Sequence, residues 1–273
     1  MNSIAFDVEN EKRFSSKIQK FFRRYQVSSI LKKCNAYKEQ GFSVVTLIQY
    51  LFCLVFRNRS MFLDMQSETE KAPEFRKDTV YRLKNSTYID WKRFTTLLAS
   101  RIISDTIKPL TSENRRNAFI VDDSIYERKG SKKAELLAKV YDHASHRYTR
   151  GFRMLTLGWS DGVTFLPVNS CLLSSENENS RINEGWDVDS NSNGAKARKF
   201  ATKKATEVIP ELISDAMESG IHANYVLFDS WFSSPKVIRS MRELGLDVDI
   251  HYVENYISLP VFGSLTLQDG TEL

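Results

Sequence analysis

Cysteine is scarce in this 273-residue sequence, which contains only Cys34, Cys53 and Cys171. Three widely spaced cysteines without a Cys-x-x-Cys pair cannot build a disulfide framework, and this pattern is typical of a reducing compartment. A membrane-spanning run is also lacking, because the most apolar stretch, residues 42–56, is too short and is interrupted by Gln49. The first residues lack the apolar segment of a secretory signal. We therefore expect a cytoplasmic protein without a membrane segment.

Positive charge is unevenly distributed along the chain. Residues 1–115 hold 21 Lys and Arg against 12 Asp and Glu, whereas residues 116–273 hold 18 against 22. Hydrophobic residues make up 41% of the sequence, which is enough for a sizeable core and excludes wholesale disorder. A basic first part and an acidic second part indicate two modules, the first suited to a polyanion such as nucleic acid.

The first module is predicted to be helical. Apolar residues recur at helical spacing from Phe14 to about Asp105, so we expect an all-α domain over residues 1–114. Segments 60–66 and 78–84 resemble the two helices of a helix-turn-helix, although their connection is longer than the usual turn. The second segment would present Arg82 and Lys84 to DNA; the alternative is a solvated basic face.

The second module, residues 115–273, is predicted to have an α/β fold. After Leu110 the apolar period becomes strand-like, and Asp161-Gly162 marks a hairpin turn. A polar stretch rich in Ser, Asn and Glu, residues 174–194, separates two groups of elements. The elements that we expect, in order, are strands 117–124, 148–159 and 163–173, a helix over 195–219 that is broken or kinked at Pro210, strand 224–229, a helix from Pro235 to Leu244, and strand 246–252.

Carboxylates end the first and the fourth predicted strands. If these strands are neighbours in the sheet, Asp229 lies beside Asp122 or Asp123. Adjacent carboxylates repel unless a cation lies between them, which favours a hard divalent metal such as Mg²⁺ or Mn²⁺. Alternation along the strand places Asp122 and Asp123 on opposite faces, so the sequence leaves the choice between them open. Taken singly, each motif is also explained as an ordinary turn.

Four segments carry a resemblance to a known family. They are Ile120-Val121-Asp122-Asp123-Ser124, Val226-Leu227-Phe228-Asp229-Ser230-Trp231-Phe232, the stretch from Arg147 to Gly162, and Lys77-Asp78-Thr79-Val80-Tyr81-Arg82. Together with the order of the elements, they resemble the IS4-type DDE transposases. The resemblance covers roughly residues 14 to 248 and implies an RNase H-like mixed sheet, here incomplete, preceded by an all-α DNA-binding domain.

The resemblance also implies an activity. Transposases of this type excise and insert an element by metal-dependent DNA cleavage and strand transfer, and bind terminal inverted repeats and target DNA as oligomers. It places two Mg²⁺ or Mn²⁺ ions on Asp122 and Asp229, with Asp123 as the alternative first acid. It further implies a homo-oligomer on double-stranded DNA, associated with the bacterial nucleoid and with no membrane.

The third acid of the family is a Glu within a Tyr-x-x-Arg-x-x-x-Glu-x-x-x-x-x-x-Lys pattern, and this pattern does not follow Asp249. Only Glu254 and Glu272 occur there, neither in that context. We therefore expect a chain that is truncated before the third catalytic acid or that changes reading frame there. The rival prediction is a catalytically inactive, truncated transposase that binds element ends and inhibits transposition. A third alternative is an RNase H-like nuclease unrelated to transposition, which needs a substitute third acid such as Glu254.

Further basic and aromatic residues are candidates for DNA contact. Helix 195–219 begins with a basic run, of which Lys196, Lys199 and Lys203 either hold phosphates or form a solvated face. Trp186 is a candidate for base stacking. Trp231 and Phe232 are predicted to be core residues. The cations that follow the first acidic motif either contact phosphates or belong to an ordinary solvated loop; they are Arg128, Lys129, Lys132 and Lys133.

Overall fold

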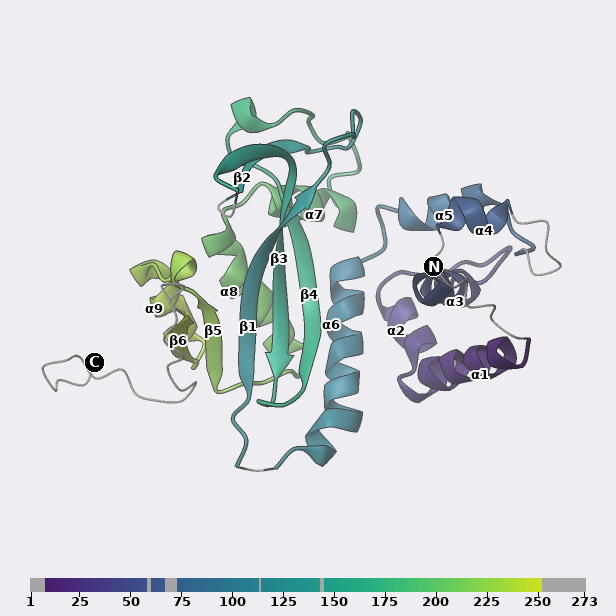
Figure 1. Cartoon of the computed structure of the whole chain (residues 1–273), viewed down its shortest axis with the longest axis horizontal. Helices are drawn as coiled ribbons and strands as arrows, with labels where there is room; N and C mark the ends of the chain where they lie inside the picture. The colour runs from purple at the N-terminus through teal and green to yellow at the C-terminus, as the bar shows by residue number, and fades with distance from the viewer. Residues whose placement is uncertain (1–7, 58–59, 67–72, 113, 143–144, 252–273) are drawn as a thin grey trace, which may run out of the picture.

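The computed structural model describes residues 8–57, 60–66, 73–112, 114–142 and 145–251. Its other helices lie on both sides of helix α6, and its strands form a single mixed sheet (Figure 1). The N-terminal helices are α1 (Val8–Arg24), α2 (Val27–Lys33), α3 (Val44–Arg57), α4 (Met61–Met65), α5 (Lys77–Lys84) and α6 (Trp91–Ile102). The later helices are α7 (Asn193–Ala201), α8 (Ala205–Glu218) and α9 (Pro235–Glu243).

The N-terminal helices bury a core of their own. Its buried members include Phe22, Leu31 and Leu47, together with Val80 and Leu83 of α5. Side-chain caps fix two of the helix starts, because Ser60 Oγ accepts from Leu63 N and Asp90 Oδ1 accepts from Arg93 N. Helix α6 also reaches the second core, to which it contributes Ala99, so the two predicted modules share this helix. The boundary after residue 114 remains a prediction.

The sheet has the strand order β2-β3-β1-β5-β6, and β4 also pairs with β3. Strand β1 runs antiparallel to β3 and parallel to β5, and β5 runs parallel to β6. This mixed α/β arrangement is the RNase H-like fold that the sequence predicts. The strands are β1 (Ala118–Glu127), β2 (Ala138–Asp142), β3 (Arg147–Ser160), β4 (Phe165–Leu173), β5 (Tyr225–Asp229) and β6 (Asp247–His251).

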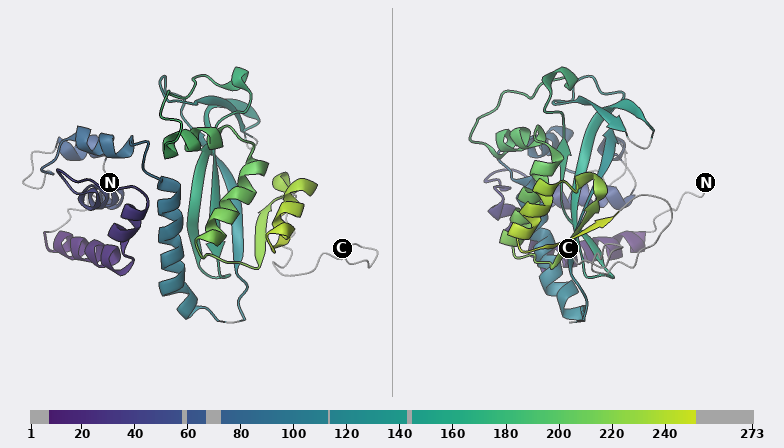
Figure 2. Two further views of the ribbon diagram at one scale, coloured as in Figure 1. Left: turned by 180° about the vertical axis from the view of Figure 1, so that it is seen from behind. Right: turned by 90° about the vertical axis from the view of Figure 1, so that its left-hand side faces the viewer.

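The two faces of the sheet differ. One face carries Phe119, Val121 and Phe228 and packs against α6, α8 and α9, where the second core is buried. Figure 2 shows α7 and α8 in front of this face when the molecule is seen from behind. No helix of the described residues covers the opposite face, which faces the viewer in Figure 1 and is called the open face below. It carries Ile120 and Leu227, because side chains alternate along a strand.

Four details of the predicted elements are wrong. The helix expected over 195–219 is two helices that separate at residues 202–204, and Pro210 lies inside α8. Strand β1 continues to Glu127, so Asp122 and Asp123 lie within it and not at its end. Strand β2 was not predicted, since five residues with two charges give a weak strand signal. The antiparallel hairpin is confirmed, with Gly162 at a φ of +88°, but its loop covers residues 161–164 and is not the two-residue turn Asp161-Gly162.

No helix among the described residues is long and apolar enough to cross a membrane.

The three cysteines are expected to react slowly in the folded protein. Burial raises the pKa of Cys34 to about 11 and of Cys171 to about 12, and it also raises the pKa of Cys53. At pH 8 only about one thiol in 10³ is a thiolate at a pKa of 11, and the thiolate is the reactive form. Labelling with a chromogenic disulfide at pH 8 should therefore be at least about 100-fold slower in native than in guanidinium-unfolded protein. Rapid labelling of two or more thiols in the native protein would contradict this expectation.

Candidate active site

Two carboxylates lie at adjacent positions of neighbouring parallel strands. Val121 of β1 pairs with Phe228 of β5, and the next residues are Asp122 and Asp229. Parallel neighbours are about 4.8 Å apart, and both acids have the parity of the open face. The antiparallel partner of Asp122 is Thr156 of β3. The fold therefore brings together the two acids that the sequence predicts to meet.

The local environments leave oxygen atoms available on both acids. Asp229 Oδ1 accepts from Ser230 Oγ at 3.1 Å and from the backbone N of Trp231 at 3.4 Å, while Oδ2 has no hydrogen bond or ion pair in the described part. Asp229 thereby caps the single helical turn Ser230–Phe232. Asp122 is exposed, and its carboxylate makes no hydrogen bond or ion pair with a described residue.

Asp123 points to the helix-covered face. Arg153 Nε donates to its Oδ2 at 2.7 Å, and Arg153 Nη2 lies 2.5 Å from the same oxygen. This ion pair is half-buried and occupies the carboxylate that the sequence leaves as the alternative first acid. By geometry Asp122, and not Asp123, shares a face with Asp229.

The pair fits a divalent cation. Mg²⁺ is commonly held by one or two carboxylates, with waters and substrate phosphates completing its octahedron, and two carboxylates with unengaged oxygens supply that set. No group of three His, Cys, Asp or Glu side chains suited to a metal occurs within the described ranges. Glu254 and Glu272, the only glutamates after Asp249, lie outside those ranges.

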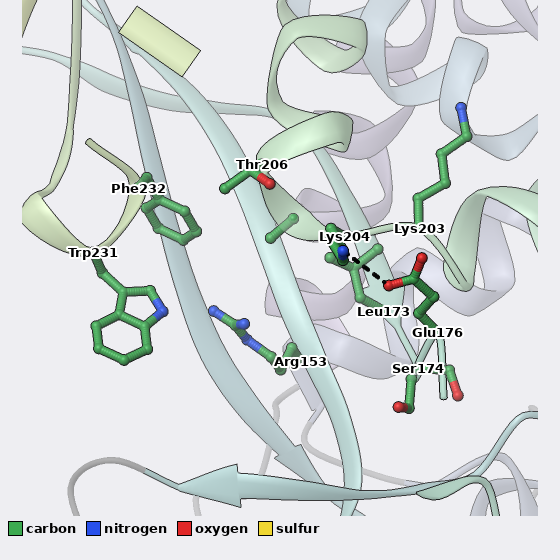
Figure 3. A pocket seen from close by; sticks show the side chains of 11 residues that line it. Arg153, Leu173, Ser174, Glu176, Lys203, Lys204, Thr206, Trp231 and Phe232 are labelled. Atoms are coloured by element: carbon green, nitrogen blue, oxygen red, sulfur yellow. Dashed lines mark ion pairs between the residues drawn. The ribbon is translucent and has the colours of Figure 1, made fainter. Parts of the chain in front are cut away.

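A cavity of about 330 Å³ lies on the helix-covered side, against the turn Ser230–Phe232 that follows Asp229. Figure 3 shows the ion pair of Lys204 with Glu176 in its wall, and Arg153 extending toward Trp231. Each lysine or arginine of its wall has an acidic partner: Arg153 pairs with Asp123, Lys204 with Glu176, and Lys203 with Glu211. The wall is formed by Arg153, Leu173, Ser174, Ser175, Glu176, Lys203, Lys204, Ala205, Thr206, Trp231 and Phe232. Its positive charge is therefore largely compensated.

The two aromatic residues after Asp229 behave differently. Phe232 is fully buried, as predicted, whereas Trp231 is 59% exposed, so its assignment to the core is wrong. Trp231 and Phe232 are consecutive residues of the helical turn that Asp229 caps, so their rings point to different sides. Trp231 is thus an exposed indole whose backbone contacts the Asp229 carboxylate.

The predicted DNA-contacting residues lie on separate elements. Arg82 and Lys84 are exposed on α5, where Val80 and Leu83 anchor the opposite side of the helix in the first core. Lys196 and Lys199 are exposed on α7, and Lys203 follows it in the cavity wall. Trp186 is 63% exposed in the polar connection. Their contact with DNA remains a prediction.

Comparison with known proteins gives one family. A model of the family described as DDE superfamily endonuclease matches residues 52–253, a range that includes α4, α5, the whole sheet and both acids. No curated protein matches the chain. Because the family match spans most of the sequence, this chain belongs to the DDE superfamily of endonucleases.

Proposed function

We propose that the chain is the transposase of an insertion sequence of the IS4 type, which binds element ends in double-stranded DNA and catalyses metal-dependent cleavage and strand transfer. The observation that carries this proposal is the adjacency of Asp122 and Asp229 on the open face of a DDE endonuclease sheet. Asp122 and Asp229 are the proposed metal ligands, and Mg²⁺ or Mn²⁺ is the proposed cofactor. Terminal inverted repeats and target DNA are the proposed partners of a homo-oligomer.

The chemistry is an in-line displacement at phosphorus. In cleavage, a water oxygen forms a new P–O bond while the bond from phosphorus to the 3′ oxygen breaks, and the 3′ oxygen leaves as a hydroxyl. In strand transfer, that 3′ hydroxyl attacks a phosphodiester of the target and releases another 3′ hydroxyl. A divalent cation, when bound, neutralises charge on the phosphate and lowers the pKa of the attacking water.

The residues of this chain hold and position the reactants. The carboxylates of Asp122 and Asp229 provide the negative charge that retains a cation against the phosphate. Hydrogen bonds from Ser230 and from the Trp231 backbone orient the Asp229 carboxylate, which leaves one oxygen directed away from them. Exposure of the open face gives a DNA duplex access to both acids.

A second candidate function is inhibition of transposition by a chain that binds DNA without cleaving it. The observation that favours it is that, among the described residues, no third carboxylate joins Asp122 and Asp229. Such a chain would occupy element ends or join subunits that carry a complete site.

Nicking of supercoiled plasmid tests the proposal. We expect purified protein to convert the plasmid to open circles in the presence of Mg²⁺ or Mn²⁺ and to be inactive in EDTA. A metal concentration on the order of 5 to 10 mM suits a weak carboxylate site. Asp229→Asn should lower the rate on the order of 10³-fold because it removes a ligand charge. The matched control is Asp247→Asn, which alters an exposed acid at the far end of neighbouring β6. A gel shift without nicking would overturn the proposed activity and support inhibition.

A further inference from the structure

A basic ribbon extends from the sheet beyond β4. It consists of the loop over residues 128–137, strand β2, and the first half of β3, and lies at the top of Figure 1. Residues 127–150 hold seven Lys and Arg against three Asp and Glu, whereas the rest of 116–273 holds 11 against 19. The second module, residues 116–273, is acidic as a whole and yet contains this basic ribbon.

Two cations lie directly opposite each other on this ribbon. Lys139 of β2 pairs with Arg150 of β3, and both side chains are exposed. Side chains at such positions have Cβ atoms about 5 Å apart, and like charges there destabilise the sheet. Neither cation has an ion pair in the part of the chain that the structure describes. An external anion would relieve the repulsion between them.

Further features extend this surface. Lys132 and Lys133 of the loop are exposed and also have no ion pair among the described residues. Tyr148 is 71% exposed, and its ring packs edge-on against Tyr141 of β2, with centroids 5.2 Å apart. These four unpaired cations contrast with the wall of the cavity near Asp229, where Arg153, Lys203 and Lys204 all have acidic partners.

The ribbon continues the strand that lies beside Asp122. Thr156 of β3 lies opposite Asp122, and Arg150 is six residues away along the same strand, with the same parity. At about 3.3 Å per residue the separation is about 20 Å, which equals about six base pairs at 3.4 Å each. Phe152, which lies between them with this parity, is 8% exposed and packs against Leu136 and Leu137, so the open face is interrupted there. The separation itself is within the span of one duplex.

We propose that the basic ribbon is a docking site for double-stranded DNA, where Lys139 and Arg150 hold backbone phosphates about six base pairs from the bond at the acid pair. The proposal rests on the proposed function, since it assigns that DNA a second contact. A two-stranded ribbon has the width that the major groove of B-DNA admits. Neutralising phosphates releases counterions, which predicts strong dependence of the affinity on salt.

The test is the double substitution Lys139→Gln and Arg150→Gln, with binding measured by fluorescence anisotropy on a labelled 30-base-pair duplex in EDTA. We expect the dissociation constant to rise at least about tenfold, and the slope of log affinity against log salt to fall by about two. The melting temperature should stay equal or rise, because the repulsion between the two cations disappears. The matched control is Lys236→Gln with Arg239→Gln, two exposed cations of α9 on the other side of the sheet.

Unchanged affinity and an unchanged salt slope in the ribbon variant would overturn the proposal, as would an equal loss in the α9 control. Stronger competition by a single strand or an RNA duplex of the same sequence would overturn the assignment to double-stranded DNA. Binding in EDTA needs no cleavage, so a failure of the proposed catalytic function can be distinguished from a failure of the proposed docking site. In that case the wild-type chain binds the duplex through the ribbon but does not nick plasmid with Mg²⁺.

Discussion

Replacing Asp122 with asparagine is expected to weaken Mn²⁺ binding at least about tenfold and to lower plasmid nicking on the order of 10³-fold. The reason is position: Asp122 follows the residue that pairs with Phe228, and so lies beside Asp229 on the open face. Two carboxylates without counter-cations retain a divalent ion mainly through their combined charge. An isosteric amide halves that charge while it preserves the strand.

The neighbouring substitution Asp123→Asn is the matched comparison. The carboxylate of Asp123 points to the helix-covered face and already pairs with Arg153, so we expect no change in Mn²⁺ affinity. The free energy of unfolding should fall by about 1 kcal/mol, because a half-buried charge-assisted pair is lost. Mn²⁺ binding is measured by the decrease of its free electron paramagnetic resonance signal, and stability by urea unfolding. If Asp123→Asn lost the metal and Asp122→Asn kept it, the assignment of the first acid would be reversed.

The contrast between these two acids also shows how far the sequence determines the site. The alternation of side chains places Asp122 and Asp123 on opposite faces, but a strand pattern alone does not tell which face is covered. That depends on where α6, α8 and α9 pack, which is a long-range property of the chain. The adjacency of Asp122 and Asp229 is predictable because an apolar run precedes each acid, although β1 continues past Asp122 to Glu127.

The features that the sequence did not predict are short or depend on context. Strand β2 has five residues, and its place in the sheet comes from pairing with the extended first half of β3. Trp231 was assigned to the core by its hydrophobicity, but the turn that Asp229 caps leaves it exposed. Helices α7 and α8 are separate because Lys204, the residue that caps the start of α8, has an extended backbone with φ −70° and ψ 143°. Such breaks are set locally, by a few residues without a strong composition signal.

The largest expected loss of stability comes from Asp161→Ala, at about 3 kcal/mol. Asp161 is only 1% exposed in the turn between β3 and β4. Its Oδ1 accepts from the backbone N of Val163 and of Thr164, at 3.1 and 2.7 Å. Its Oδ2 accepts from Thr111 Oγ1 at 2.7 Å and from Arg115 Nη1 at 3.0 Å. Alanine leaves these donors without the acceptor that ties the segment before β1 to the hairpin.

The same carboxylate predicts the direction of a pH effect. Burial alone would raise the pKa of Asp161, but the hydrogen bonds from Thr111, Thr164, Val163 and Arg115 outweigh it and hold the pKa well below its usual range. A depressed pKa in the folded state contributes stability above the unfolded value of about 4, and that contribution is lost as the pH falls further. The stability difference between wild type and Asp161→Ala should therefore narrow between about pH 5 and pH 3.

Urea unfolding of both proteins between pH 7 and pH 3 measures this difference. Asp187→Ala is the control, because Asp187 is exposed in the polar connection and has no partner among the described residues; its change should stay within about 0.5 kcal/mol at every pH. A constant gap across the range would mean that Asp161 acts through packing alone. A gap near zero at pH 7 would mean that water replaces the lost acceptor, and that the burial of Ile107 and its neighbours in the second core is enough to hold Thr111 beside the sheet.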